Sequence, residues 1–259
     1  MSHVETRVEG HVLVIHINRP EKYNALSVEI YHALGEALAR LEQDETLRVG
    51  LIHAAGRNFT AGIELAQWAP IFREGSAFPL APGNIDPFGL RGPQHGKPLV
   101  IAVQGYCFTW GVELLLNCEV RVAARDTQFQ MLEVQRGLYP CAGATIRLPR
   151  EIGWGNAHRV LLTGDRWSAE QALAWGMVQE LTGPGEQYAA ALRISQGIAD
   201  AAPLAVRGLL RSTRIAATSS REEAVQQLSR DLVPVMESED AAEGVRSFLE
   251  RRKAVFRGR

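Results

Sequence analysis

Two glutamates stand inside apolar stretches of the sequence, where a carboxyl group could do acid–base chemistry. Glu113 lies between Val112 and Leu114 in VELLLN, and Glu133 lies in FQMLEV. Burying a carboxylate without partners is costly, and burial raises a carboxyl pKa towards neutrality. Two carboxyl groups in one cleft can divide the roles of acid and base if their surroundings separate their pKa values. Each glutamate could instead have a structural role, on a helix surface or in a buried ion pair.

Two turns that contain glycine could supply backbone hydrogen-bond donors. In AAGRNFTAGIEL a strand gives way to Gly62 and then to a helix, and in VQGYCFTWGVEL a strand gives way to Gly105 and a helix that begins near Trp110. A helix start leaves N–H groups unpaired and carries partial positive charge. Two such ends pointing at one spot would form an anion site or an oxyanion hole. Gly62 and Gly111 could equally be simple turn or packing residues.

Alternating strands and helices are expected to position these groups. Four apolar runs rich in β-branched residues predict strands over 11–20, 48–56, 98–105 and 119–124. Ser27 can cap a helix that runs to about Asp44, because apolar residues recur there at helical spacing. These βα units predict an α/β fold.

The rest of the chain contains a long loop and then mostly helices. Residues 73–98 are rich in Gly and Pro and predict a loop, of the kind that is often functional. Capping boxes predict helix starts at Ser168, with Gln171, and at Ser220, with Glu223. We therefore expect a core over 1–195 and a helical region over 196–259.

Composition narrows the class of protein. The chain has 259 residues, 46% of them apolar, and a net charge of −1, which gives no reason to expect nucleic acid or a membrane as a partner. Its three cysteines lack CxxC spacing, so neither a disulfide framework nor a metal site is predicted. The first ten residues are polar and no run approaches the ~20 apolar residues of a membrane span, so we expect a cytoplasmic protein.

Five stretches occur in the order and at the spacing of one known family. They are NRPEKYNALS, GRNFTAGIEL, VQGYCFTWGVEL, FQMLEVQRGLYPCAGAT and SEDAAEGVRSFLERRKAVF. From about residue 5 to residue 257 the chain resembles the crotonase (enoyl-CoA hydratase/isomerase) superfamily. The resemblance implies a spiral of ββα units with C-terminal helices that trimerise, a homotrimer or dimer of trimers, and an acyl-CoA thioester substrate with no separate cofactor.

The resemblance also assigns roles to residues of this chain. Glu113 would hold and deprotonate a water molecule, and Glu133 would deliver a proton to Cα of an enoyl thioester, their 20-residue separation matching the hydratase branch. The backbone N–H groups of Ile63 and Trp110 would hold the thioester carbonyl. Further residues would contact the substrate or its coenzyme A: Lys22, Asn24, Ala25, Leu26, Ala61, Gly62, Glu64, Leu65, Gly111, Lys253 and Phe256.

The chain departs from the family pattern at three places. Trp110 stands in a run that is usually glycine, and Leu132 precedes Glu133 where proline is common. After Pro140 the chain has Cys141-Ala142-Gly143-Ala144, where the family commonly has Gly-Ala-Gly-Gly. Isomerisation of an enoyl-CoA is the first rival reaction, although isomerases of the family generally manage with the carboxylate at Glu133 alone. Dienoyl-CoA isomerases carry an acidic residue at the place of Cys141, which argues against that reaction.

Functions that involve no catalysis have weaker support in the sequence. One branch of the family binds RNA through a lysine-rich helix, but the corresponding stretch here has no lysine. A catalytically weak acyl-CoA-binding protein is compatible with Trp110. His95 is expected to be an ordinary loop histidine, and Asp126 and Glu64 to be solvated or structural. The basic residues at 251–259 would by default form a solvated helix face.

Overall fold

A computed structural model describes residues 3–75 and 78–259. Its main sheet has the strand order β1-β2-β3-β4-β6-β9 among these residues. The strands are β1 (Val4–Glu9), β2 (Val12–Ile17), β3 (Val49–Ala54), β4 (Leu99–Val103), β6 (Val120–Ala124) and β9 (Glu180–Thr182). β1 runs antiparallel to β2 and the other neighbours are parallel. The four predicted strands are confirmed as β2, β3, β4 and β6.

A second, smaller sheet carries the turns of interest. It consists of β5 (Tyr106–Phe108), β7 (Gln128–Gln130) and β8 (Arg166–Ser168), with β5 and β7 parallel. Parallel bridges from Thr60 to Cys107 and from Leu26 to Ile63 continue it. Successive units therefore add one strand to the main sheet, one extended segment to the small sheet, and then a helix. This repetition is the expected spiral of ββα units.

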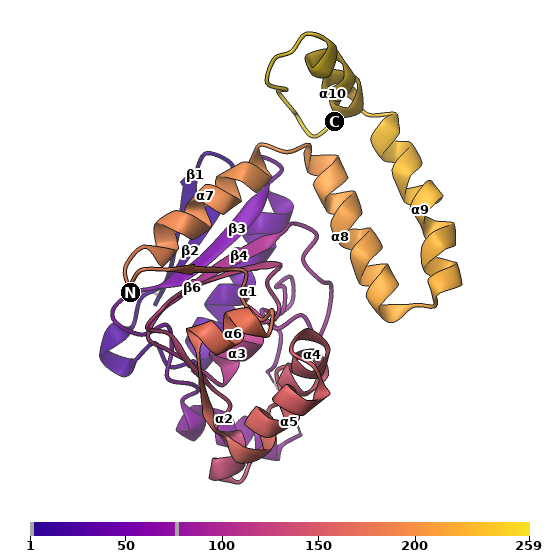
Figure 1. Ribbon diagram of the computed structural model, residues 1–259. Helices are drawn as coiled ribbons and strands as arrows, with labels where there is room; N and C mark the ends of the chain where they lie inside the picture. Colours follow the sequence, from indigo (N-terminus) through magenta and orange to yellow (C-terminus); the bar gives the residue numbers. More distant parts are fainter. Residues whose placement is uncertain (1–2, 76–77) are drawn as a thin grey trace.

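Helices cover both faces of the main sheet (Figure 1). The face made by Val14, Leu51 and Val100 packs against α7 (Gln187–Ala199). The opposite face packs against α1 (Val28–Gln43), whose apolar side is buried as its spacing predicted. The Ser27 hydroxyl accepts a hydrogen bond from the Ile30 N–H, which confirms the expected cap. The two sides together form the core that supports the small sheet.

The remaining helices lie around the small sheet and at the C-terminal end. They are α2 (Leu65–Arg73), α3 (Trp110–Leu115), α4 (Ala144–Glu151), α5 (Trp154–Thr163), α6 (Ala169–Ala174), α8 (Pro203–Thr218), α9 (Arg221–Met236) and α10 (Glu239–Leu249), with 3-10 turns η1 (Pro20–Lys22) and η2 (Glu133–Arg136). Both predicted capping boxes are present. No helix in the described ranges is long and apolar enough to cross a membrane.

The C-terminal helices extend away from the sheets (Figure 1). α8 and α9 pack against each other, and α10 follows at the far end. Two ion pairs attach α8 to the core, from Arg207 to Glu42 at 2.8 Å and from Arg214 to Glu119 at 2.8 Å. The predicted boundary at residue 195 falls within α7, which packs on the main sheet. The chain therefore leaves the sheet just after that helix. The division into two regions stays a prediction.

The predicted loop after α2 is partly a piece of the core. Between Glu74 and Pro98 the described residues form turns and irregular backbone. Phe78 and Phe88 are nevertheless buried and pack against Tyr31 of α1. Asp86 is completely buried and accepts hydrogen bonds from the backbone N–H groups of 88, 90 and 91. The loop is therefore built around one carboxylate and a set of aromatic rings. Residues 76–77 lie outside the described residues.

Candidate active site

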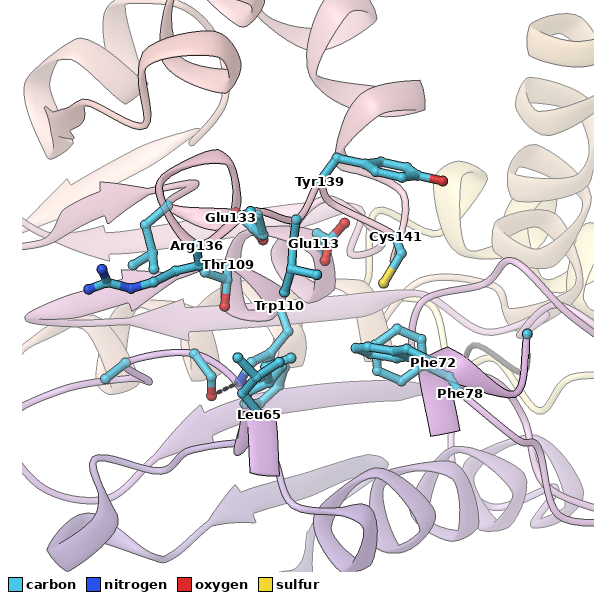
Figure 2. Close-up of a pocket in the computed structure, with 17 residues that line it drawn as sticks. Leu65, Phe72, Phe78, Thr109, Trp110, Glu113, Glu133, Arg136, Tyr139 and Cys141 are labelled. Carbon is cyan, nitrogen blue, oxygen red and sulfur yellow. Dashed lines mark hydrogen bonds between the residues drawn. The ribbon is translucent and has the colours of Figure 1, made fainter. Parts of the chain in front are cut away.

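A cavity of about 670 Å³ brings the three predicted stretches together. It opens between α2, the start of α3 and η2, and both glutamates line it (Figure 2). The lining residues are Ala61, Gly62, Ile63, Leu65, Phe72, Gly75, Phe78, Thr109, Trp110, Glu113, Leu132, Glu133, Arg136, Gly137, Leu138, Tyr139 and Cys141. The two carboxyl groups and both proposed backbone donors thus belong to one concave, mainly apolar site.

Glu113 is a buried carboxylate with backbone partners. It lies in the first turn of α3 and is 3% exposed. Its Oε1 accepts hydrogen bonds from the N–H of Ala142 at 2.8 Å and of Ala144 at 3.1 Å. Burial raises the pKa of Glu113 to about 7, and these two N–H groups act in the opposite direction by favouring the charged form. Glu113 can therefore hold negative charge near neutral pH without being solvated.

Glu133 differs from Glu113 because only its own backbone N–H favours its charged form. It begins η2, and its Oε2 is buried without a hydrogen-bond partner in the described part of the chain. Burial raises the pKa of Glu133 to about 8, and the nearby charge of Glu113 contributes to the rise. Two like charges this close disfavour joint ionisation, so the pair keeps about one proton near neutral pH. The proton resides preferentially on Glu133, because the Ala142 and Ala144 N–H groups stabilise the charged form of Glu113.

The two predicted backbone donors face the same cavity. Trp110 is the first residue of α3, so its N–H has no partner within the helix. Ile63 lines the cavity beside it, and within the described ranges neither N–H donates to a backbone or side-chain acceptor. Gly62 has φ +120° and a Cβ there would lie 2.8 Å from Thr109 Oγ1, so a side chain is excluded where the two segments meet.

One part of the prediction about these donors is wrong. α2 begins at Leu65, and Ile63 lies before it in an extended segment bridged to Leu26. The Ile63 N–H is therefore not at a helix start and receives no first-turn dipole. Its free donor arises because the Leu26 N–H bonds to the Gly62 carbonyl and the Glu64 N–H bonds to the Leu26 carbonyl, which leaves the N–H between them unpaired.

The predicted substrate contacts divide into three groups. Ala61, Gly62 and Leu65 line the cavity. The segment from Lys22 to Leu26 lies behind it, with Lys22 exposed and Asn24 buried against the carbonyls of Ala55 and Asn58. Ala25 is half-buried in that segment, Gly111 is buried within the first turn of α3, and Glu64 pairs with Arg19 beside the cavity.

The third group is distant from the cavity within this chain. Lys253 and Phe256 follow α10 and do not line the cavity. Lys253 forms an exposed ion pair with Asp200 at 2.7 Å, and the Phe256 carbonyl accepts from Arg48 at 2.8 Å. Their predicted contact with coenzyme A stays a prediction.

Several cavity residues were not predicted as site residues. Phe72 and Phe78 form an aromatic wall, and Leu138 and Tyr139 line another part of the cavity. Cys141 also lines it, whereas Cys107 and Cys118 are buried in the core. The Ala142 and Ala144 N–H groups were missed because backbone donors carry no side-chain signal. Phe78 could have been suspected from its place in the long loop.

His95 lies outside this cavity and has a structural environment. It is 2% exposed, its Nε2 lies 2.7 Å from Arg214 Nη2, and Glu119 is 3.2 Å away. This cluster connects α8 to the core. Asp126 lines a different surface depression, beside Arg57 and Tyr106.

Comparison with known proteins places the chain in a family. Residues 7–259 match the family described as Enoyl-CoA hydratase/isomerase. Enoyl-CoA hydratase EchA19 of Mycobacterium tuberculosis is 34% identical over 96% of this chain and 94% of its own length. Carnitinyl-CoA dehydratase of Salmonella typhi is 33% identical over 96% of both chains.

Solved structures agree with this placement. A probable enoyl-CoA hydratase/isomerase from Mycobacterium abscessus superposes with a TM-score of 0.97, at 41% identity over 99% of both chains. An enoyl-CoA hydratase from Mycobacterium tuberculosis superposes with a TM-score of 0.91, at 34% identity over 100% of both chains. The sheets, the glutamates and the backbone donors thus have a common explanation, because the chain belongs to the enoyl-CoA hydratase/isomerase family of the crotonase superfamily.

Proposed function

We propose that the protein is an enoyl-CoA hydratase that adds water syn across the double bond of a 2-trans-enoyl-CoA. The observation that carries the proposal is the pair of carboxyl groups of unequal pKa in one cavity with two free backbone N–H groups. A hydratase needs one carboxylate as base and one carboxylic acid as proton donor at the same pH. The names of the similar hydratases and dehydratases support the same reaction class.

The reaction follows from these charges. The Glu113 carboxylate holds a water molecule and takes its proton as the water oxygen bonds to Cβ of the substrate. The electron pair of the double bond moves through Cα towards the thioester oxygen, where the Ile63 and Trp110 N–H groups stabilise the developing enolate. Protonated Glu133 then gives its proton to Cα, and proton exchange restores the pair. The acid–base pair contributes ~10²–10⁴-fold and each donor ~10²–10³-fold.

The cavity wall supports a substrate with an apolar acyl group. Phe72, Phe78 and Leu138 line the cavity together with the carboxyl groups. An acyl chain placed along these rings would exclude bulk water and strengthen the electrostatic interactions at the thioester. The thioester carbonyl is itself the electron sink, so the proposed reaction requires no cofactor apart from the coenzyme A of the substrate.

We also propose that the protein works as a homotrimer or a dimer of trimers in the cytoplasm, in the metabolism of fatty acids. Large apolar side chains are exposed on the C-terminal helices: Leu209, Val225, Leu228, Leu232, Met236, Phe248 and Leu249. An exposed apolar surface of this kind is typical of a subunit interface. Because Lys253 and Phe256 lie far from the cavity of their own chain, their proposed contact with coenzyme A would be with substrate bound to a neighbouring copy.

Hydration of crotonyl-CoA and of longer enoyl-CoAs, followed by loss of the enone absorbance, tests the proposed reaction. We expect turnover by the wild type and a loss of ~10²-fold or more in kcat for Glu113→Gln and for Glu133→Gln. Glu36→Gln, at an exposed position on α1, is the matched control and should retain full activity. A wild type that binds acyl-CoA but hydrates no enoyl-CoA would refute hydration, and isomerisation of 3-enoyl-CoA would be tested next.

A further inference from the structure

The side chain of Trp110 connects the two backbone donors. Its indole Nε1–H donates to the Gly62 carbonyl oxygen at 2.6 Å, drawn as the dashed line in Figure 2. The Gly62 carbonyl and the Ile63 N–H belong to the same peptide group. Trp110 therefore supplies one donor from its own backbone and holds the peptide that supplies the other.

A hydrogen bond to the carbonyl oxygen of a peptide group changes how strongly the N–H of that group can donate. The Gly62 carbonyl accepts the Trp110 indole N–H at 2.6 Å and the Leu26 N–H at 2.9 Å, and the Thr60 hydroxyl is a third, longer contact at 3.4 Å. The two short bonds fix the plane of the peptide, and they polarise it so that its N–H becomes a stronger donor. An oxyanion hole works because its donors are oriented before charge develops. The indole bond thus acts on both the orientation and the strength of the Ile63 N–H.

The packing leaves the indole little freedom to leave this position. Trp110 is 1% exposed and its ring lies 6.3 Å from that of Phe59. The next residue, Gly111, approaches Thr60 so closely that a Cβ would lie 2.4 Å from Thr60 Cγ2. The start of α3 is therefore pressed against the segment 60–62, and the indole bond is one of several contacts that hold the two together.

We propose that the Trp110 side chain is a positioning residue of the oxyanion hole, which orients and polarises the Gly62–Ile63 peptide for the thioester carbonyl. The inference rests on the proposed function for the identity of that carbonyl. It gives a reason for a bulky residue in a run where the family usually has glycine. The indole hydrogen bond joins the two donor segments, which a glycine at position 110 would leave free to move relative to each other.

The test compares Trp110→Phe with Trp167→Phe. Trp167 is as deeply buried as Trp110 but does not line the cavity, and its Nε1 has no hydrogen-bond partner among the described residues, so Trp167→Phe removes a buried indole without removing a hydrogen bond. For Trp110→Phe we expect kcat to fall about tenfold with KM changed less than about twofold, a smaller effect than the ~10²–10³-fold caused by loss of a whole donor. Trp167→Phe should keep kcat within about twofold of the wild type.

A spectroscopic readout separates positioning from general loss of packing. A push–pull cinnamoyl-CoA thioester absorbs further to the red when its carbonyl is polarised. Its red shift on binding should shrink in Trp110→Phe and stay unchanged in Trp167→Phe. Equal effects in the two variants, or an unchanged shift in Trp110→Phe, would overturn the proposal. This measurement needs no turnover, so it still decides the question if the wild type hydrates no enoyl-CoA.

A second variant covers the case in which Trp110→Phe does not fold. β-(3-Benzothienyl)alanine installed at position 110 keeps the shape of the indole and replaces its N–H by sulfur. The same loss of kcat and of red shift is expected, because only the hydrogen bond is removed. Full activity and a full red shift with this residue would show that the ring alone matters, and would refute the positioning role.

Discussion

At the scale of single residues, the site depends on two carboxyl groups that the fold treats differently. Burial raises the pKa of both, to about 7 for Glu113 and about 8 for Glu133. The base must be ionised, so activity is lost as pH falls below about 7; the acid must be protonated, so activity is lost as pH rises above about 8. We expect kcat/KM for crotonyl-CoA to be bell-shaped between these limits. A flat profile from about pH 5 to about pH 9 would contradict the assignment.

The raised pKa of Glu133 also predicts an effect on stability. Its folded pKa of about 8 exceeds the ordinary value of 4.5, so the folded state binds more protons than the unfolded state between these values. Stability therefore falls as pH rises through this window. Glu133→Gln, which stays neutral, should melt at a higher temperature than the wild type at about pH 8.5, and the difference should shrink towards pH 4.5. Thermal melts of both proteins across that range would show it, and a difference that did not change with pH would contradict it.

At the scale of elements, the loop between α2 and β4 shows how one buried carboxylate can shape a cavity wall. Asp86 accepts three backbone N–H bonds, and the Tyr31 hydroxyl lies 3.3 Å from its Oδ1. Asp86→Ala leaves the buried Phe88 N–H and the partly buried N–H groups of 90 and 91 without this acceptor, at about 1–3 kcal/mol for a donor that stays buried and unpaired. We expect a lower melting temperature and a larger rise of KM for long acyl chains than for crotonyl-CoA, because Tyr31 and Phe88, which pack against Phe78, lose their hydrogen bonds to Asp86.

The conservative variant makes this prediction specific. Asp86→Asn keeps the size of the side chain and one carbonyl acceptor, so its KM values should lie between those of the wild type and Asp86→Ala. Initial rates on C4 and C12 enoyl-CoAs provide the comparison. If Asp86→Ala raised both KM values equally, the loop would not contribute to chain-length preference.

The elements also show what could be predicted from the sequence. The helix after Ser27 and the four apolar strands follow from local spacing and capping, and they are confirmed. The short strands β5, β7 and β8 were missed because three residues carry no periodicity, and their pairing depends on distant partners. β1 was missed because most of its side chains are exposed and polar.

The candidate site, like the fold, could be predicted only in part from the sequence. Motif order pointed to Glu113 and Glu133, but spacing alone could not show that they share a cavity. The N–H groups of Ala142 and Ala144, which separate the two pKa values, come from the start of α4 and the residues before it, 29 and 31 residues after Glu113. The indole bond of Trp110 spans 48 residues. Contacts at such separations are set by tertiary packing, which the sequence pattern does not display.

At the scale of the whole molecule, the C-terminal helices have few contacts that would bury their apolar side chains. Leu232 and Met236 of α9 are 56% and 60% exposed, and Phe248 of α10 is 82% exposed. The last residues are nevertheless ordered by a buried acceptor, since the Asp240 carboxylate accepts from the N–H groups of Arg257 and Gly258. An ordered C-terminal segment beside an exposed apolar face is expected of a subunit that assembles through this region.

Disrupting that face tests assembly and substrate binding together. The double variant Leu232→Glu, Met236→Glu places two charges on the exposed face of α9 without entering the core, so the chain should still fold. We expect sedimentation to show a monomer where the wild type is a trimer or hexamer. The affinity for acyl-CoA should fall as well, because Lys253 and Phe256 could no longer reach substrate on another copy. Lys253→Ala is the matched control, since it should weaken acyl-CoA binding and leave the assembly intact. A double variant that sediments as the wild type does would place the interface elsewhere, and a monomer with full acyl-CoA affinity would confine substrate binding to one chain.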